Sequence, residues 1–171
     1  MSGGFSRSVA CGGLVVGSVL GLAGSFAPSA SVRGVLWGVD GIALVVAAAL
    51  LTVHYFRRGD DVVAAGFLVF VAGETLVLST AAMELSSAGP LFGAGSGLWA
   101  MSLLLLSAPR VAPVWVRGVG GLAAILFLVV ALRTFLGEPL TALTKPLPFF
   151  AYPLLVATLL GLARERYRHP A

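Results

Sequence analysis

Long apolar runs alternate with short polar connections along the whole of this 171-residue chain. A helix needs about 20 apolar residues to cross the hydrocarbon core of a bilayer, which is roughly 30 Å thick. Within lipid, only helices and closed barrels satisfy their own backbone hydrogen bonds. The runs therefore predict an all-α, polytopic membrane protein, a bundle of about six transmembrane helices that forms a single domain over residues 1–171. The predicted spans are residues 9–27, 34–56, 62–85, 91–108, 119–136 and 147–162.

Composition agrees with a membrane protein and excludes other classes. Only 11% of the residues are charged, against about 25% in soluble domains, and the mean hydropathy is +1.01. The net charge of +4 comes from basic residues scattered at the ends of the runs, which is typical of membrane anchoring. A nucleic-acid-binding face needs clustered basic residues. We therefore expect a lipid bilayer, and no nucleic acid, as a partner.

The distribution of Lys and Arg predicts the orientation, since cytoplasmic loops carry an excess of basic residues. With six spans, both termini share one side with the second and fourth connections. That side carries Arg7, Arg57, Arg58, Arg110, Arg117, Arg164, Arg166 and Arg168. The opposite side carries Arg33, Arg133 and Lys145. This excess predicts a multi-pass protein of a bacterial-type cell inner membrane, with both termini in the cytoplasm.

Two of the predicted spans have an alternative interpretation. The first run resembles a secretory signal peptide, because Arg7 precedes it and small residues follow it. Its length favours a retained helix. The sixth run is the shortest, and Pro148 and Pro153 interrupt it. A sixth span that turned back would leave the basic C-terminal tail outside, so the charge distribution favours six spans over five.

Glycines recur every four residues in two of the predicted helices. Residues at this spacing lie on one face of a helix, and stripes of small residues let helix backbones approach closely. The stripes are Gly13, Gly17 and Gly21 in the first run, and Gly89, Gly93 and Gly97 at the start of the fourth. They predict either helix packing within one subunit or the seam of a homo-oligomer.

The two halves of the chain share several short features. Each half contains a glycine stripe, an Ala-Pro pair and a Val-Arg-Gly-Val tetrapeptide. Small transporters are often built from inverted repeats of this kind. Because the spacing between the matching features differs from one to the next, a weak 3+3 inverted repeat is a hypothesis only.

Four charged residues lie in or at the ends of apolar runs: Asp40, Glu74, Glu84 and Arg133. A charge at the bilayer centre costs roughly 3 kcal/mol on insertion scales, so such residues usually face a partner, a cavity or a pathway. At 1.5 Å per residue, Asp40 lies about 9 Å below the outer end of its helix and Glu74 lies near the midplane. We take the four as candidate residues of a pathway or binding site in the outer half of the membrane.

Each of the four has a structural alternative. Arg133 can extend to the outer headgroups, and Glu84 can lie at the interface. Asp40 can pair with Arg133. Glu74 cannot reach either interface, so it is protonated and hydrogen-bonded within the bundle, or it has a functional role.

The sequence gives no pattern for metal, haem or nucleophilic chemistry. The single cysteine, Cys11, excludes a disulfide within the chain and a paired-cysteine metal site. His54 lies at an inner interface and the only other histidine, His169, is in the polar tail, so a bis-histidine haem is not expected. We therefore predict no catalytic residue, no metal and no cofactor. Five aromatic residues near the predicted interfaces are expected to form a membrane-anchoring belt: Trp37, Tyr55, Trp115, Tyr152 and Tyr167.

Three functions fit these features. The preferred hypothesis is a small-solute or ion carrier or channel, with Glu74 and Asp40 lining a polar pathway open to the outer side. The alternative is a non-catalytic accessory or assembly subunit of a larger membrane complex, in which the acids pair across interfaces. The third is a membrane enzyme that acts on a lipid-like substrate with Glu74 as acid or base. A cavity that reaches Glu74 would favour the first.

Overall fold

A computed structural model describes residues 3–80, 88–139 and 146–168, and every element in these ranges is helical. The elements are α1 (Gly3–Ser25), α2 (Ala30–Arg57), α3 (Asp61–Thr80), α4 (Gly89–Ser107), α5 (Val114–Phe135), the π-helical turn η1 (Leu147–Ala151) and α6 (Tyr152–Arg168). The predicted all-α membrane bundle is thereby confirmed at the level of fold class.

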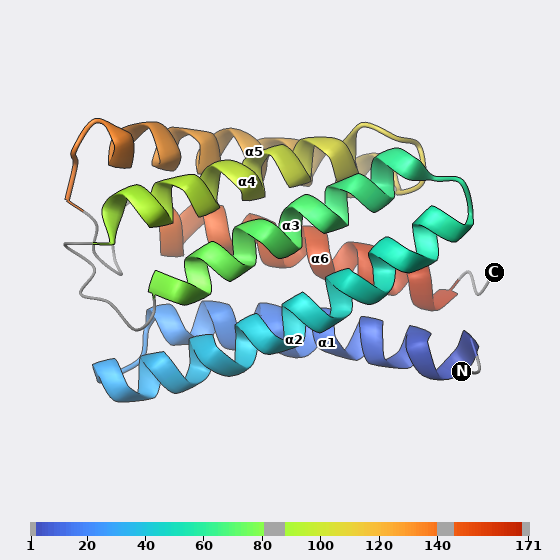
Figure 1. The fold of residues 1–171 in the computed structure, drawn as a ribbon, viewed down its shortest axis with the longest axis horizontal. Coiled ribbons are helices and arrows are strands. Elements are labelled where there is room, and N and C mark those ends of the chain that lie inside the picture. The colour runs from blue at the N-terminus through green and yellow to red at the C-terminus, as the bar shows by residue number, and fades with distance from the viewer. Residues whose placement is uncertain (1–2, 81–87, 140–145, 169–171) are drawn as a thin grey trace.

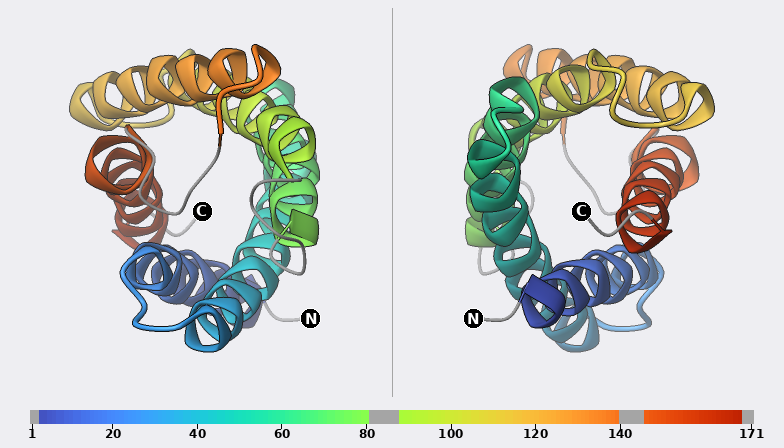
Figure 2. Two further views of the ribbon diagram at one scale, coloured as in Figure 1. Left: turned by 90° about the vertical axis from the view of Figure 1, so that its left-hand side faces the viewer. Right: turned by 90° about the vertical axis from the view of Figure 1, so that its right-hand side faces the viewer.

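The helices run roughly along one axis and form a ring in chain order (Figure 2). Each helix contacts its neighbours in sequence, and α6 closes the ring against α1. Helix α1 begins at the end of the bundle where α6 finishes and where α2 joins α3 and α4 joins α5 (Figure 1). We call this the proximal end and the opposite one the distal end. Arg7 and Tyr167 meet there, with the guanidinium 6.0 Å from the ring centroid.

Five of the six helices, α1 to α5, are long and apolar enough to cross a membrane. Helix α6 has 17 residues and continues directly from η1. The proline-rich start of the sixth run is therefore helical, but its first turn is widened: the amide of Ala151 donates to the carbonyl of Pro146, 3.0 Å away. Residues 81–85 of the third predicted span lie outside the described residues.

Local sequence explains where several helices begin and end. Helix α2 starts four residues before the predicted span because the Ser29 hydroxyl accepts a hydrogen bond from the amide of Val32, at 3.2 Å, as a helix N-cap does. The tight turn after α2 needs a positive φ, which Gly59 supplies at 76°, and Gly137 does the same after α5 at 85°.

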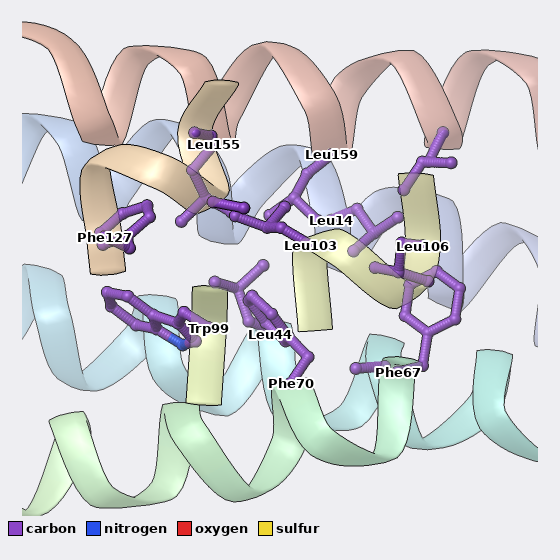
Figure 3. Close-up of a cluster of buried hydrophobic side chains, with 14 of the residues drawn as sticks. Leu14, Leu44, Phe67, Phe70, Trp99, Leu103, Leu106, Phe127, Leu155 and Leu159 are labelled. Carbon is purple, nitrogen blue, oxygen red and sulfur yellow. The ribbon is translucent and has the colours of Figure 1, made fainter. Parts of the chain in front are cut away.

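Apolar side chains face both inward and outward, as expected of helices that pack together inside lipid. The centre of the ring is filled by a cluster of buried side chains that includes Phe67, Phe70, Leu103 and Phe127 (Figure 3). The outer surface exposes large apolar side chains on several helices, among them Val35, Ile42, Leu68, Ile125 and Leu132. This surface is compatible with contact with the lipid bilayer.

The glycine stripe of α1 faces α2. A Cβ atom on Gly13 would lie 2.8 Å from the carbonyl oxygen of Ala43, and one on Gly17 would lie 2.5 Å from Cγ of Leu44. Real Cβ atoms do not approach other atoms so closely. Because these glycines have no side chains, the backbone of α1 packs directly against residues of α2 within one chain.

The second stripe, on α4, leaves no room for a side chain at Gly93. Gly93 lies against Thr134 of α5, whereas a Cβ on Gly97 would meet its nearest atom, of Ala131, at 3.8 Å. A Cβ on Gly89, which is itself buried, would meet no atom of the described residues within 4 Å. Helix α4 therefore makes its tightest approach to α5 at Gly93. The inverted repeat stays a hypothesis.

Candidate functional site

A partly enclosed pocket lies inside the ring, in the distal half of the bundle, lined by residues of α1, α2, α3, α4 and α6. About 50 Å³ of it is open to the centres of water molecules. Its walls are mostly apolar, but they include two of the candidate acids, Asp40 and Glu74. Residues from separate helices thus converge on one space.

Glu74 is buried on α3, with 3% of its surface exposed. The neighbouring Gly73 has no side chain, so α3 can approach α4 closely at this point. A Cβ atom on Gly73 would lie only 3.0 Å from the Gly95 carbonyl oxygen and from Cδ1 of Trp99. The Oε2 atom of Glu74 is buried and makes no hydrogen bond of good geometry among the described residues, although the Trp99 side chain lies close enough to interact with the carboxyl group. Leaving such an acceptor unpaired costs on the order of 1–3 kcal/mol, and more if it is charged.

Asp40 reaches the pocket from α2, where a glycine makes room for it. A Cβ on Gly21 would lie 2.6 Å from Oδ2 of Asp40, so only glycine leaves space for the carboxyl group against α1. The Oδ1 atom is buried and, like Oε2 of Glu74, lacks a hydrogen-bond partner in the described part of the chain. The pocket therefore contains two carboxyl groups, each with an unused acceptor.

Aromatic rings form much of the remaining wall. Trp37 is held by a hydrogen bond from its indole nitrogen to the Gly21 carbonyl, at 3.1 Å, and the guanidinium of Arg33 lies 5.7 Å from its ring. Trp99 lies in an aromatic cluster, with its ring 5.2 Å from that of Phe127 and 6.1 Å from that of Tyr152. These contacts fix the orientation of the rings that line the pocket.

The sequence-based prediction does not foresee that Tyr152 and Trp37 line the pocket. Both were expected in an interfacial aromatic belt, but both line the pocket. Tyr152 follows η1, whose wide turn ends with the Tyr152 amide bonded to the Leu147 carbonyl. Irregular turns of this kind are frequent at functional sites. Two signals in the sequence could have indicated these pocket residues. Prolines surround Tyr152, and Trp37 lies three residues before Asp40, on the same face of its helix.

Of the other two candidate residues, Arg133 does not line the pocket. Arg133 donates from Nε to Glu138, at 2.6 Å, and the two side chains are 42% and 46% exposed. Arg133 is therefore paired at the distal end of α5, and the alternative in which it pairs with Asp40 is not what the structure has. Glu84 lies outside the described residues.

On the proximal side of the pocket, the centre of the bundle is closed by apolar side chains. Leu14, Phe67, Leu103 and Leu106 are each at most 2% exposed, and they point toward one another between the helices (Figure 3). Each lies on its helix nearer the proximal end than the pocket residues of that helix. This layer separates the pocket from the proximal end.

In the ranges that the structure describes, no group of three or more His, Cys, Asp or Glu side chains is placed to hold a metal ion. Comparisons with protein-family models, with curated proteins and with solved structures each found no match. Functional inference therefore rests on the geometry of the pocket.

Proposed function

We propose that this protein is a carrier that moves a small solute across the membrane, with the pocket between Glu74 and Asp40 as its loading site. The observation that carries the proposal is the carboxyl group of Glu74, which is buried, faces the pocket and has an unpaired oxygen. A structural glutamate would have its acceptors satisfied within the bundle. The Oε2 atom of Glu74 is available to a solute that enters the pocket.

Charge supports the same conclusion. Among the residues that the structure describes, those that line the pocket include Asp40 and Glu74 but no Lys or Arg. Two carboxylates in an apolar space repel each other and are poorly solvated. A proton or a positively charged solute is needed to balance them, so the pocket takes up positive charge when it is loaded.

The apolar layer favours a carrier over an open channel. Four buried apolar side chains fill the ring on the proximal side of the pocket: Leu14, Phe67, Leu103 and Leu106. They block access to the pocket from the proximal end. A carrier opens its site to one side at a time. The layer is the barrier expected for a carrier that faces the distal side.

We place the protein in a bacterial-type inner membrane with the proximal end in the cytoplasm. All eight arginines assigned to the cytoplasmic side lie at described backbone positions at or near the proximal end, including Arg7, Arg57 and Arg117. We expect a reporter fused after Ala171 to be active only if it is a cytoplasmic reporter. Activity of a periplasmic reporter at that position would contradict this orientation.

A survey of solutes tests the carrier proposal. The purified chain is reconstituted into proteoliposomes, and currents on a solid-supported membrane are recorded for organic amines, inorganic monovalent cations, amino acids and sugars, each with and without a pH gradient. We expect saturable currents with at least one class of solute. An absence of current with every class would contradict the proposal and favour the accessory-subunit alternative.

A further inference from the structure

We propose that the solute is a small protonated organic amine, with its ammonium group at Glu74 and Asp40 and its apolar body along Trp37, Trp99 and Tyr152. The assignment rests on the proposed function, because it names the solute of that carrier. Three properties of the pocket lead to it: its charge, its unused hydrogen-bond acceptors and its aromatic walls.

The charge of the pocket selects a cation. Asp40 and Glu74 are its acids, and among the described residues the basic group near it is Arg33, which stacks over Trp37 rather than lining the pocket. A neutral or anionic solute would leave the carboxyl groups without a counter-charge. A monovalent cation balances one of them, and a proton can balance the other.

The unused acceptors select a cation that has N–H donors. Oε2 of Glu74 and Oδ1 of Asp40 lack hydrogen bonds, and so does the hydroxyl of Ser18, which also lines the pocket. A primary ammonium has three donors, and its hydrogen bonds to carboxylates are charge-assisted and strong. A quaternary ammonium has no such donor. For a divalent metal ion, the described residues contain no group of three or more His, Cys, Asp or Glu side chains placed to hold it.

The walls select an apolar body of limited size. Leu44, Leu78, Phe92 and Leu155 line the pocket together with the aromatic rings. A cavity needs about 10–15 Å³ of space for each water centre, so the 50 Å³ here corresponds to only a few heavy atoms. The faces of Trp and Tyr also attract a cation directly. A short alkylammonium ion, such as n-butylammonium, fits these limits.

The test compares three molecules that share a butyl chain, on the full chain in detergent: n-butylammonium, n-butyltrimethylammonium and 1-butanol. Binding is followed by calorimetry and by tryptophan fluorescence, since Trp37 and Trp99 line the pocket. We expect n-butylammonium to bind at least about tenfold more tightly than either analogue, because only it has both the charge and the donors. Equal binding of the quaternary ion or of the alcohol would overturn the assignment.

Substitutions of the two pocket acids, with a control at the surface, test whether the amine binds in the pocket. Glu74→Gln is expected to weaken n-butylammonium binding at least about tenfold. Glu138→Gln is the matched control, because it removes a carboxylate that is paired with Arg133 at the surface. Asp40→Asn provides the same test should Glu74→Gln fail to fold. An equal loss with Glu138→Gln would show that the amine binds elsewhere and would overturn the proposal.

The outcome separates this inference from the carrier proposal. A Glu74-dependent current with another class of solute, without n-butylammonium binding, would overturn the amine assignment and leave the carrier standing. Tight n-butylammonium binding with no current from any class would keep the amine site and overturn the carrier.

Discussion

Replacing Gly17 with leucine is expected to destabilise the whole bundle. A Cβ at this position would lie 2.5 Å from Cγ and 2.7 Å from Cδ2 of Leu44, and leucine adds three further carbons. Helices α1 and α2 would have to move apart or repack. Forcing extra carbons into a packed core costs roughly 1–3 kcal/mol, and for a chain of this size 1 kcal/mol shifts Tm by about 2–4 °C. We therefore expect Tm in detergent to fall by about 5–10 °C.

Gly12→Leu is the matched control for that measurement. Gly12 lies on the same helix at an exposed position, and a Cβ there would meet nothing within 4 Å. The control should keep the Tm of the wild type. Equal behaviour of the two variants would mean that the stripe does not hold α1 against α2.

Glu74→Gln is expected to remove transport while the fold survives. Glutamine keeps the shape of the side chain and its hydrogen-bonding capacity, but it cannot carry the negative charge that balances a cationic solute. Hydrogen bonds to charged groups contribute about 1.5–3 kcal/mol, which corresponds to roughly a tenfold to hundredfold loss of affinity. Glutamine keeps a side-chain oxygen that can accept from the neighbouring Trp99 of α4, so we expect the packing of the helices to survive.

Much of the fold could be predicted from the sequence. Run length and apolar composition predict the spans, because a helix in lipid must satisfy its own backbone. The boundaries were less predictable. The Ser29 cap extends α2 beyond its apolar run, and the η1 turn depends on how prolines distort a helix, which hydropathy does not report.

The candidate site could be predicted only in part. Asp40 and Glu74 stood out because a carboxyl group within an apolar run is costly, and they do line one pocket. Helix depth gives no information on which way a side chain turns, so Trp37 and Tyr152 were assigned to the membrane interface. Arg133 was placed at the correct end of its helix, but its partner, Glu138, comes from a connection that returns toward α5.

The transport current of the wild type, set beside those of Glu74→Gln and Glu74→Leu, tests the role of Glu74 most directly. Each protein is reconstituted at equal density, its fold is checked by Tm, and currents are recorded with the solute that gives the largest wild-type response. We predict that both variants fold and that both lose the current. If both variants keep full current and full stability, Glu74 is not part of the loading site, and the carrier mechanism proposed for this pocket is wrong.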